Sequence, residues 1–191
     1  NLVDQSKSLD SSIIKHDPNP DIINIIFIGS LTPRKCPFLI IELAKALRKC
    51  NIGFQITVLG VGRLKSRLEF LIKKHSFDNC IRLLGHISNP RDYINLMDLL
   101  FHPSSSEGTS RACLEALASG IPCLVRDTSA NRFFIEENYN GFFFNSIKDI
   151  SSNVTASARL RRENFENKSL LLPKHKEDLI LDTYSKVIFT E

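Results

Sequence analysis

The apolar runs that end at glycine constrain the fold of this chain most. The first run, Ile22–Ile28, is almost continuously apolar and β-branched, and Gly29 follows it. Two further apolar runs, Phe54–Leu59 and Ile81–Leu84, are also followed directly by glycine. A strand that is apolar at successive positions is buried on both faces, as in a parallel sheet covered by helices. We therefore expect these runs to be strands of a largely parallel sheet.

Stretches with helical spacing of apolar residues separate the strands. We predict helices at 37–49, 63–75, 90–98, 111–119 and 131–137, and further strands at 99–101, 123–125 and 142–144. This alternation predicts an α/β fold with a doubly wound, mainly parallel, Rossmann-like sheet. We expect a linker over 1–20, the α/β domain over 21–150, and C-terminal helices over 151–191, the last of them at about 174–190.

Composition is that of an ordinary soluble domain. The chain has 191 residues, of which 42% are hydrophobic and 24% charged, with a net charge of +4. This mild, scattered positive charge permits an anionic ligand but does not favour nucleic acid as a partner. Five cysteines without a C-x-x-C pair indicate reduced thiols and a cytoplasmic location. No apolar run approaches the length of a transmembrane helix.

The stretch from His102 to Gly120 holds the most informative polar residues. Its second half is an apolar helix with one polar stripe, formed by Arg111, Glu115 and Ser119. Glu107 lies on the preceding loop, so both carboxylates can flank the helix N-terminus, where free N–H groups favour phosphate. A nucleotide sugar has hydroxyls at both ends and phosphate between them. The alternative is a solvent-facing stripe with an Arg111–Glu115 ion pair.

Two further loops follow predicted strands and should lie at the same edge of the sheet. Lys35, in the loop after the first strand, is a candidate phosphate ligand, and the alternative is an ordinary solvated lysine. His86, after the third strand, should line the same crevice. A role for His86 as a general base is the less favoured reading, since single histidines in loops usually have no chemical role.

The sequence lacks the signature motifs of several other classes of protein. Gly60-Val61-Gly62 is followed by Lys65 where the dinucleotide fingerprint needs a third glycine, and no P-loop motif occurs. There is no D-x-D motif and no His/Cys cluster. We therefore expect neither a dehydrogenase, nor a P-loop NTPase, nor a metal-dependent transferase, and we expect no metal site and no cofactor.

Glu107 and Glu115 resemble the Glu-x7-Glu motif of retaining GT-B glycosyltransferases, in the family 4-like group known as glycosyl transferases group 1. The resemblance covers about residues 21–190 and resides in an ordered set of motifs. These are Gly29 and Lys35, Leu59–Gly62, Leu83–Gly85, Pro103–Ser104, Glu107–Gly108, Glu115–Ala116, Ala118–Pro122 and Asn140–Phe142. The chain is similar to the C-terminal, donor-binding half of such enzymes.

The resemblance implies a sugar transferase of hexosyltransferase type that uses a nucleotide diphosphate sugar, as in polysaccharide biosynthesis. Glu115 would bind the ribose hydroxyls, and Glu107 would bind the donor sugar and orient its reacting carbon. Lys35 would stabilise the negative charge that develops on the leaving diphosphate, and we count Glu107 and Lys35 as the catalytic residues.

The remaining predicted contacts are to the substrate. We expect Ser30 and Arg34 to contribute from the loop after the first strand, and His86 from the turn that holds the base. The N–H groups near Ser110, Arg111 and Ala112 would receive the diphosphate.

The resemblance also implies partners beyond the donor. An acceptor-binding N-terminal domain of the same protein would be absent from this chain, which should then transfer sugar slowly or not at all. Whether the protein contacts a membrane is left open, and any peripheral membrane contact would be made through that absent half.

Three positions depart from the family pattern. Ser30 stands where relatives usually have arginine, Cys36 where they have glycine, and Phe133 where they have glutamate. We expect Arg34 or Arg111 to supply the missing cation. The departures leave open a non-catalytic nucleotide-sugar-binding or interaction module on the same fold, and a nucleotide-sugar epimerase is a further alternative.

Overall fold

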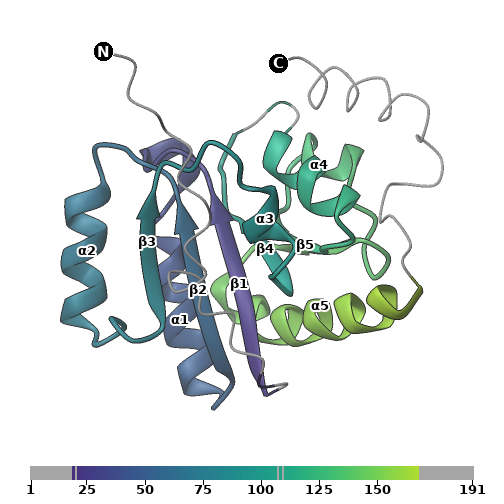
Figure 1. Ribbon diagram of the computed structural model, residues 1–191, viewed down its shortest axis with the longest axis horizontal. Helices are drawn as coiled ribbons and strands as arrows, with labels where there is room; N and C mark the ends of the chain where they lie inside the picture. The colour runs from purple at the N-terminus through teal and green to yellow at the C-terminus, as the bar shows by residue number, and fades with distance from the viewer. Residues whose placement is uncertain (1–18, 20, 107, 109, 168–191) are drawn as a thin grey trace.

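The computed structural model describes residues 19, 21–106, 108 and 110–167, which form a six-stranded parallel sheet (Figure 1). The strands lie in the order β3-β2-β1-β4-β5-β6, and every neighbouring pair is parallel. They are β1 Ile22–Ile28, β2 Gly53–Leu59, β3 Ile81–Gly85, β4 Leu99–His102, β5 Cys123–Arg126 and β6 Gly141–Phe144. The predicted doubly wound α/β fold is confirmed. The predicted linker and the predicted last helix lie outside the described residues, apart from Asn19.

Helices cover both faces of the sheet, as the apolar runs predicted (Figure 1). They are η1 Pro33–Lys35, α1 Leu39–Lys49, α2 Lys65–Lys74, α3 Arg91–Ile94, α4 Arg111–Ala118, η2 Asn131–Phe133 and α5 Ile147–Asn167. Within β1, Ile25 and Phe27 pack into the core under α1, α2 and α5, whereas Ile26 packs into the core under α3 and α4. Side chains alternate across a strand, so apolar residues at successive positions are needed to fill both cores, and Asn24 is the one polar residue of β1.

The predicted helix at 90–98 is wrong in length, because α3 ends at Ile94. The reason is a contact with β1. The Asp98 N–H donates to the Asn24 carbonyl at 2.8 Å, and the Asp98 carboxylate accepts from the Asn24 N–H at 2.8 Å. These bonds hold Asp98 beside β1, where the chain enters the strand β4, so the helix does not continue to Asp98.

The predicted helix at 131–137 is also wrong, since only the short 3-10 helix η2 forms there. Asn140, which is fully buried, takes the backbone groups that a longer helix would use. Its side chain accepts from the Glu136 N–H at 2.7 Å and donates to the Phe134 carbonyl at 3.0 Å. The Asn140 side chain therefore ends the helix by bonding to these two backbone groups.

Gly60 and Gly62 allow the loops after β1 and β2 to touch backbone to backbone. Gly60 has a φ of +152°, and a Cβ at this position would overlap the carbonyl oxygen of Gly29. Gly62 likewise leaves no room for a Cβ beside the Leu31 carbonyl. The Leu31 N–H donates to the Val61 carbonyl at 2.9 Å. The two glycines therefore hold the loop after β1 at the carboxyl edge of the sheet.

Candidate functional site

The strand order changes direction between β1 and β4, and ligands of open parallel sheets bind outside the carboxyl ends of strands at such a point. The loops that follow these two strands are joined at this point. The carbonyl oxygen of Arg34 accepts from the Ser105 N–H at 2.9 Å and from the hydroxyls of Ser104 and Ser105 at 3.1 Å each. The structure therefore brings the two predicted site loops into direct contact.

Lys35 lies on η1, in the loop after β1, with its side-chain stem against Gly29. A Cβ on Gly29 would lie 3.4 Å from the Lys35 Cδ, so glycine leaves room for this stem. Lys35 is half-buried, whereas Ser30 and Arg34 of the same loop are exposed. A half-buried ammonium interacts more strongly with an anion than an exposed one, because less water screens it.

Cys36 keeps the backbone shape that glycine would favour. Its φ of 48° lies in the left-handed region, and its thiol lies 3.3 Å from the Pro33 carbonyl. A non-glycine residue in this region costs about 1 kcal/mol. Cys36 therefore adopts a left-handed conformation that glycine would adopt more readily.

The N-terminus of α4 has the arrangement that the sequence predicted. Ser110 is the buried N-cap, and its hydroxyl accepts from the Cys113 N–H at 3.4 Å. The N–H groups of Arg111 and Ala112 have no acceptor within the part of the chain that the structure describes. Free N–H groups at a helix start, together with the positive end of the helix dipole, favour an anion.

Glu115 lies one turn further along α4 and is half-buried. Burial raises its pKa above the usual carboxyl range, and the nearby cations of Arg111 and Arg91 partly oppose this rise. Among the described residues, Glu115 forms no ion pair with Arg111 or with any other side chain. The half-buried carboxylate thus lacks the ion-pair partner that the alternative interpretation of this stripe requires.

The raised pKa predicts how stability depends on pH. The folded state keeps the Glu115 proton to a higher pH than the unfolded state does. Stability is therefore lost as pH rises from the unfolded-state pKa of this carboxyl to its higher folded-state pKa. Urea unfolding should therefore find Glu115→Gln more stable than the wild type at about pH 7. The difference should vanish below about pH 4, where the unfolded carboxyl is protonated too. A less stable glutamine variant at neutral pH would mean that attraction to Arg111 and Arg91 outweighs desolvation.

Of the other two predicted residues, the described structure includes only His86, and it does not bring His86 to this point. His86 follows β3 at the sheet border, with β2 between it and β1, and it is exposed. It shares the carboxyl edge with Lys35, but no contact joins it to the loops after β1 and β4 in the described residues. Glu107 lies outside the described residues.

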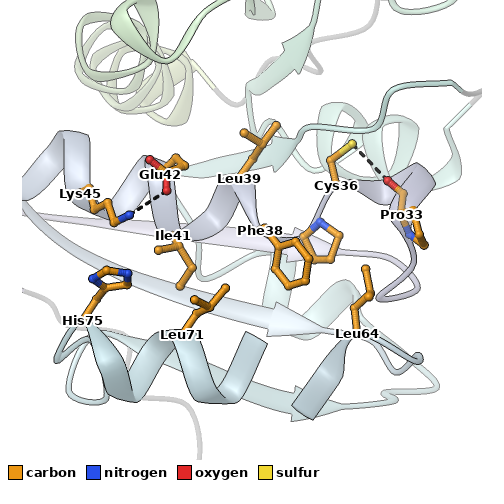
Figure 2. Close-up of a pocket in the computed structure, with 11 residues that line it drawn as sticks. Pro33, Cys36, Phe38, Leu39, Ile41, Glu42, Lys45, Leu64, Leu71 and His75 are labelled. Atoms are coloured by element: carbon orange, nitrogen blue, oxygen red, sulfur yellow. Dashed lines mark hydrogen bonds and ion pairs between the residues drawn. The ribbon is translucent and has the colours of Figure 1, made fainter. Parts of the chain in front are cut away.

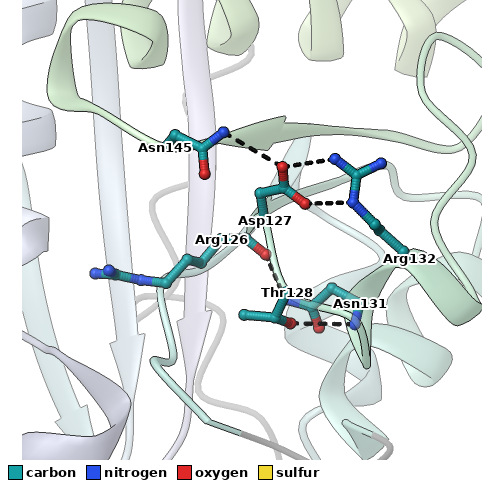
Figure 3. A network of polar contacts seen from close by, with 6 residues as sticks. All are labelled: Arg126, Asp127, Thr128, Asn131, Arg132 and Asn145. Atoms are coloured by element: carbon teal, nitrogen blue, oxygen red, sulfur yellow. Dashed lines mark hydrogen bonds and ion pairs between the residues drawn. The ribbon is translucent and has the colours of Figure 1, made fainter.

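Polar residues at the end of β5 were missed by the sequence analysis (Figure 3). Asp127 forms an ion pair with Arg132, with Nε–Oδ1 and Nη2–Oδ2 distances of 2.6 Å, and it accepts from the Asn145 side chain at 3.3 Å. Arg126 points the other way, and its Nε donates to the Pro103 carbonyl at 3.3 Å. The available signal was two charged residues directly after the predicted strand at 123–125.

A cavity of about 400 Å³ lies elsewhere, between α1 and α2 (Figure 2). Its walls are mostly apolar, and the Glu42–Lys45 ion pair of 2.8 Å lies at its rim. Its lining residues are Pro33, Cys36, Pro37, Phe38, Leu39, Ile41, Glu42, Lys45, Leu64, Leu71 and His75. None of the predicted site residues lines it, although Pro33 and Cys36 belong to the same loop as Lys35.

The described residues contain neither a metal-binding cluster nor a membrane-spanning helix. No group of three or more His, Cys, Asp or Glu side chains in this part of the chain could hold a metal ion. Nor is any described helix both long enough and apolar enough to cross a bilayer.

The family follows from a comparison with known families: the chain belongs to the glycosyl transferases group 1, whose family model matches residues 10–169. Its fold is that of the Rossmann-like domains of GT-B glycosyltransferases. Both agree with the resemblance carried by the sequence motifs.

Two curated relatives illustrate the similarity. The chain is 27% identical over 143 residues to the UDP-Gal:alpha-D-GlcNAc-diphosphoundecaprenol alpha-1,3-galactosyltransferase of Escherichia coli, covering 73% of this chain and 37% of that protein. It is 25% identical over 130 residues to the poly(ribitol-phosphate) alpha-N-acetylglucosaminyltransferase of Staphylococcus aureus, covering 66% and 26% respectively. The chain thus spans about a third of the length of such relatives, or less.

Solved structures share the fold. S. aureus TarM, crystallised as a mutant with fondaparinux, alpha-GlcNAc-glycerol and UDP, matches 88% of this chain with a TM-score of 0.67 and 22% identity. Anabaena HepE with UDP and glucose matches 90% with a TM-score of 0.65 and 15% identity. The C-terminal domain of LpcC from Francisella tularensis matches 75% with a TM-score of 0.62, and there the match covers 83% of the other chain.

Proposed function

We propose that this chain is the donor-binding domain of a retaining glycosyltransferase that takes a sugar from a nucleotide diphosphate sugar. One observation carries the proposal. The loops after β1 and β4 are joined at the switch point through the Arg34 carbonyl, which places the Lys35 loop beside the loop that leads to the N-terminus of α4. Family membership supplies the reaction class.

Each group of site residues contacts a different part of the donor. Glu115 accepts hydrogen bonds from the two ribose hydroxyls, and Lys35 and the N–H groups of Arg111 and Ala112 receive the diphosphate. Negative charge grows on the diphosphate as the sugar leaves. Hydrogen-bond donors that are held in place before the reaction stabilise this charge and lower the barrier. Glu107 binds the hydroxyls of the donor sugar. His86 and its neighbours contact the base.

The acceptor requires more protein than this chain contains. An N-terminal domain would hold the acceptor against the donor sugar, in keeping with the share of the curated relatives that the chain covers. The chain by itself should therefore bind donor and transfer sugar slowly or not at all. UDP is the first nucleotide to test, because the E. coli relative is named for UDP-Gal and structures of TarM and HepE hold UDP.

A thermal-shift screen of UDP-, GDP- and ADP-sugars tests the proposal. One class of donor should raise the melting temperature in a concentration-dependent way, because ligand binding to the folded state alone stabilises it. Lys35→Ala should reduce this shift. Lys45→Ala is the matched control, because Lys45 is a half-buried lysine like Lys35 but lies on α1, where it pairs with Glu42. A wild-type chain that responds to no nucleotide sugar or free nucleotide would contradict the proposal.

A binding module without transferase activity is the second candidate, and Phe133 favours it. This residue is 42% exposed on η2, at a position where the resemblance to the family predicts a glutamate. Analysis of products from donor alone, and from donor with acceptor, separates the candidates. Released sugar or transfer by the protein that contains this chain identifies an enzyme, an epimerised donor identifies an epimerase, and unchanged donor identifies a binding module.

A further inference from the structure

Arg126 ends β5 at the same carboxyl edge of the sheet as the candidate site. It is half-buried, and its Nε is held by the Pro103 carbonyl at 3.3 Å. Its guanidinium carbon lies 5.9 Å from the centre of the Phe144 ring. Pro103 is followed by Ser104 and then Ser105, both of which bond to the Arg34 carbonyl. The chain therefore runs directly from the carbonyl that holds Arg126 to the contact with the Lys35 loop.

The terminal nitrogens of Arg126 are available for a ligand. Its hydrogen bond uses Nε, and in the described residues no acceptor contacts Nη1 or Nη2 and no carboxylate lies within 4.0 Å. The neighbouring carboxylate, Asp127, points away and is taken by Arg132 and Asn145 (Figure 3). A half-buried planar cation with two free terminal nitrogens suits phosphate oxygens, which it can bind in pairs.

The other arginines near the site are less suited to this task. Arg34 and Arg111, which the sequence offered as replacements for the arginine absent at Ser30, are both exposed. An exposed long side chain loses more conformational freedom on binding and acts through more water. Arg126 is already held by Pro103, so less freedom is lost when it binds an anion.

We propose that Arg126 binds the diphosphate of the donor and is the second cation beside Lys35. This inference rests on the proposed function. It assigns to Arg126 the positive charge toward the diphosphate that Ser30 cannot supply. Arg126 follows β5, which lies two strands away from β1 in the sheet because β4 lies between them. Arg126 is not among the residues that carry the resemblance to the family.

Calorimetry with UDP and with uridine tests this assignment, because the two ligands differ only in the diphosphate. Arg126→Ala should weaken UDP binding about 10- to 100-fold, as expected for the loss of charge-assisted hydrogen bonds, and leave uridine binding unchanged. Arg126→Lys keeps the charge without the paired nitrogens and should lie between the wild type and the alanine variant. If the alanine variant does not fold, Arg126→Gln carries the same comparison.

Arg132→Ala is the matched control, because it removes the same charge as Arg126→Ala. Arg132 lies six residues after Arg126, and its side chain is 61% exposed. It should leave UDP affinity unchanged. Three results would overturn the assignment: equal losses for UDP and uridine, no loss for UDP, or a larger loss in the Arg34→Ala/Arg111→Ala double variant. A wild-type chain that binds no nucleotide would instead contradict the proposed function.

Discussion

Replacing Glu115 by alanine should lower the affinity of the chain for UDP about 100-fold or more. A carboxylate that accepts from two ribose hydroxyls makes two hydrogen bonds to a charged group, which together contribute about 3 kcal/mol or more. This carboxylate is half-buried in the folded chain, and that burial raises its pKa. Calorimetric titration of the wild type and the variant with UDP measures the effect.

The choice of ligand separates ribose binding from an indirect effect. The wild type should prefer UDP to 2′-deoxy-UDP, and Glu115→Ala should bind the two equally, because the partner of the 2′-hydroxyl is gone. Glu69→Ala is the control, since Glu69 is a half-buried helical carboxylate of α2 that pairs with Lys65 at 3.7 Å. A preference for UDP that survives in the Glu115 variant would exclude Glu115 as the ribose ligand.

Gly60→Ala should destabilise the chain by about 3 kcal/mol or more, which is a large effect for a single methyl group. The added Cβ would overlap the Gly29 carbonyl, and the φ of +152° is one that alanine rarely adopts. Relief requires the loops after β1 and β2 to separate, and this would also displace Lys35. Urea unfolding of the two proteins gives the difference in free energy of unfolding.

Gly85→Ala distinguishes the steric overlap from the backbone strain. Gly85 has a φ of +79°, but a Cβ there would meet no atom within 4 Å. This variant should lose only about 1–2 kcal/mol, which is the cost of the left-handed conformation. Equal losses at both glycines would show that the loops after β1 and β2 can separate without cost.

Periodicity predicted the strands better than the short helices. Ile22–Ile28 was predicted as a strand with its observed bounds, because burial on both faces gives an almost continuous apolar run, which only Asn24 interrupts. The helices at 90–98 and 131–137 were predicted too long. Their ends are set by Asn24 and Asn140, which bond from outside each helix. Such contacts leave no periodic trace in the sequence.

The site shows the same division. Glu115 and Lys35 could be proposed from their local settings, a carboxylate on an apolar helix and a lysine after a buried strand. Arg126 could not, because its relation to the site depends on Pro103, which lies 23 residues away in the chain. Their assignments as ligand contacts remain predictions for the experiments above to test.

The amino-acid sequence by itself determined the parallel sheet and the helix that carries Glu115. These features depend on neighbouring residues or on residues at a fixed spacing, so the order of side chains is enough to specify them. Only the tertiary structure decided that the Arg34 carbonyl joins two loops, and that Arg126 lies half-buried with its terminal nitrogens available. Those properties depend on which distant backbone groups meet when the sheet forms, and on how much water that meeting removes.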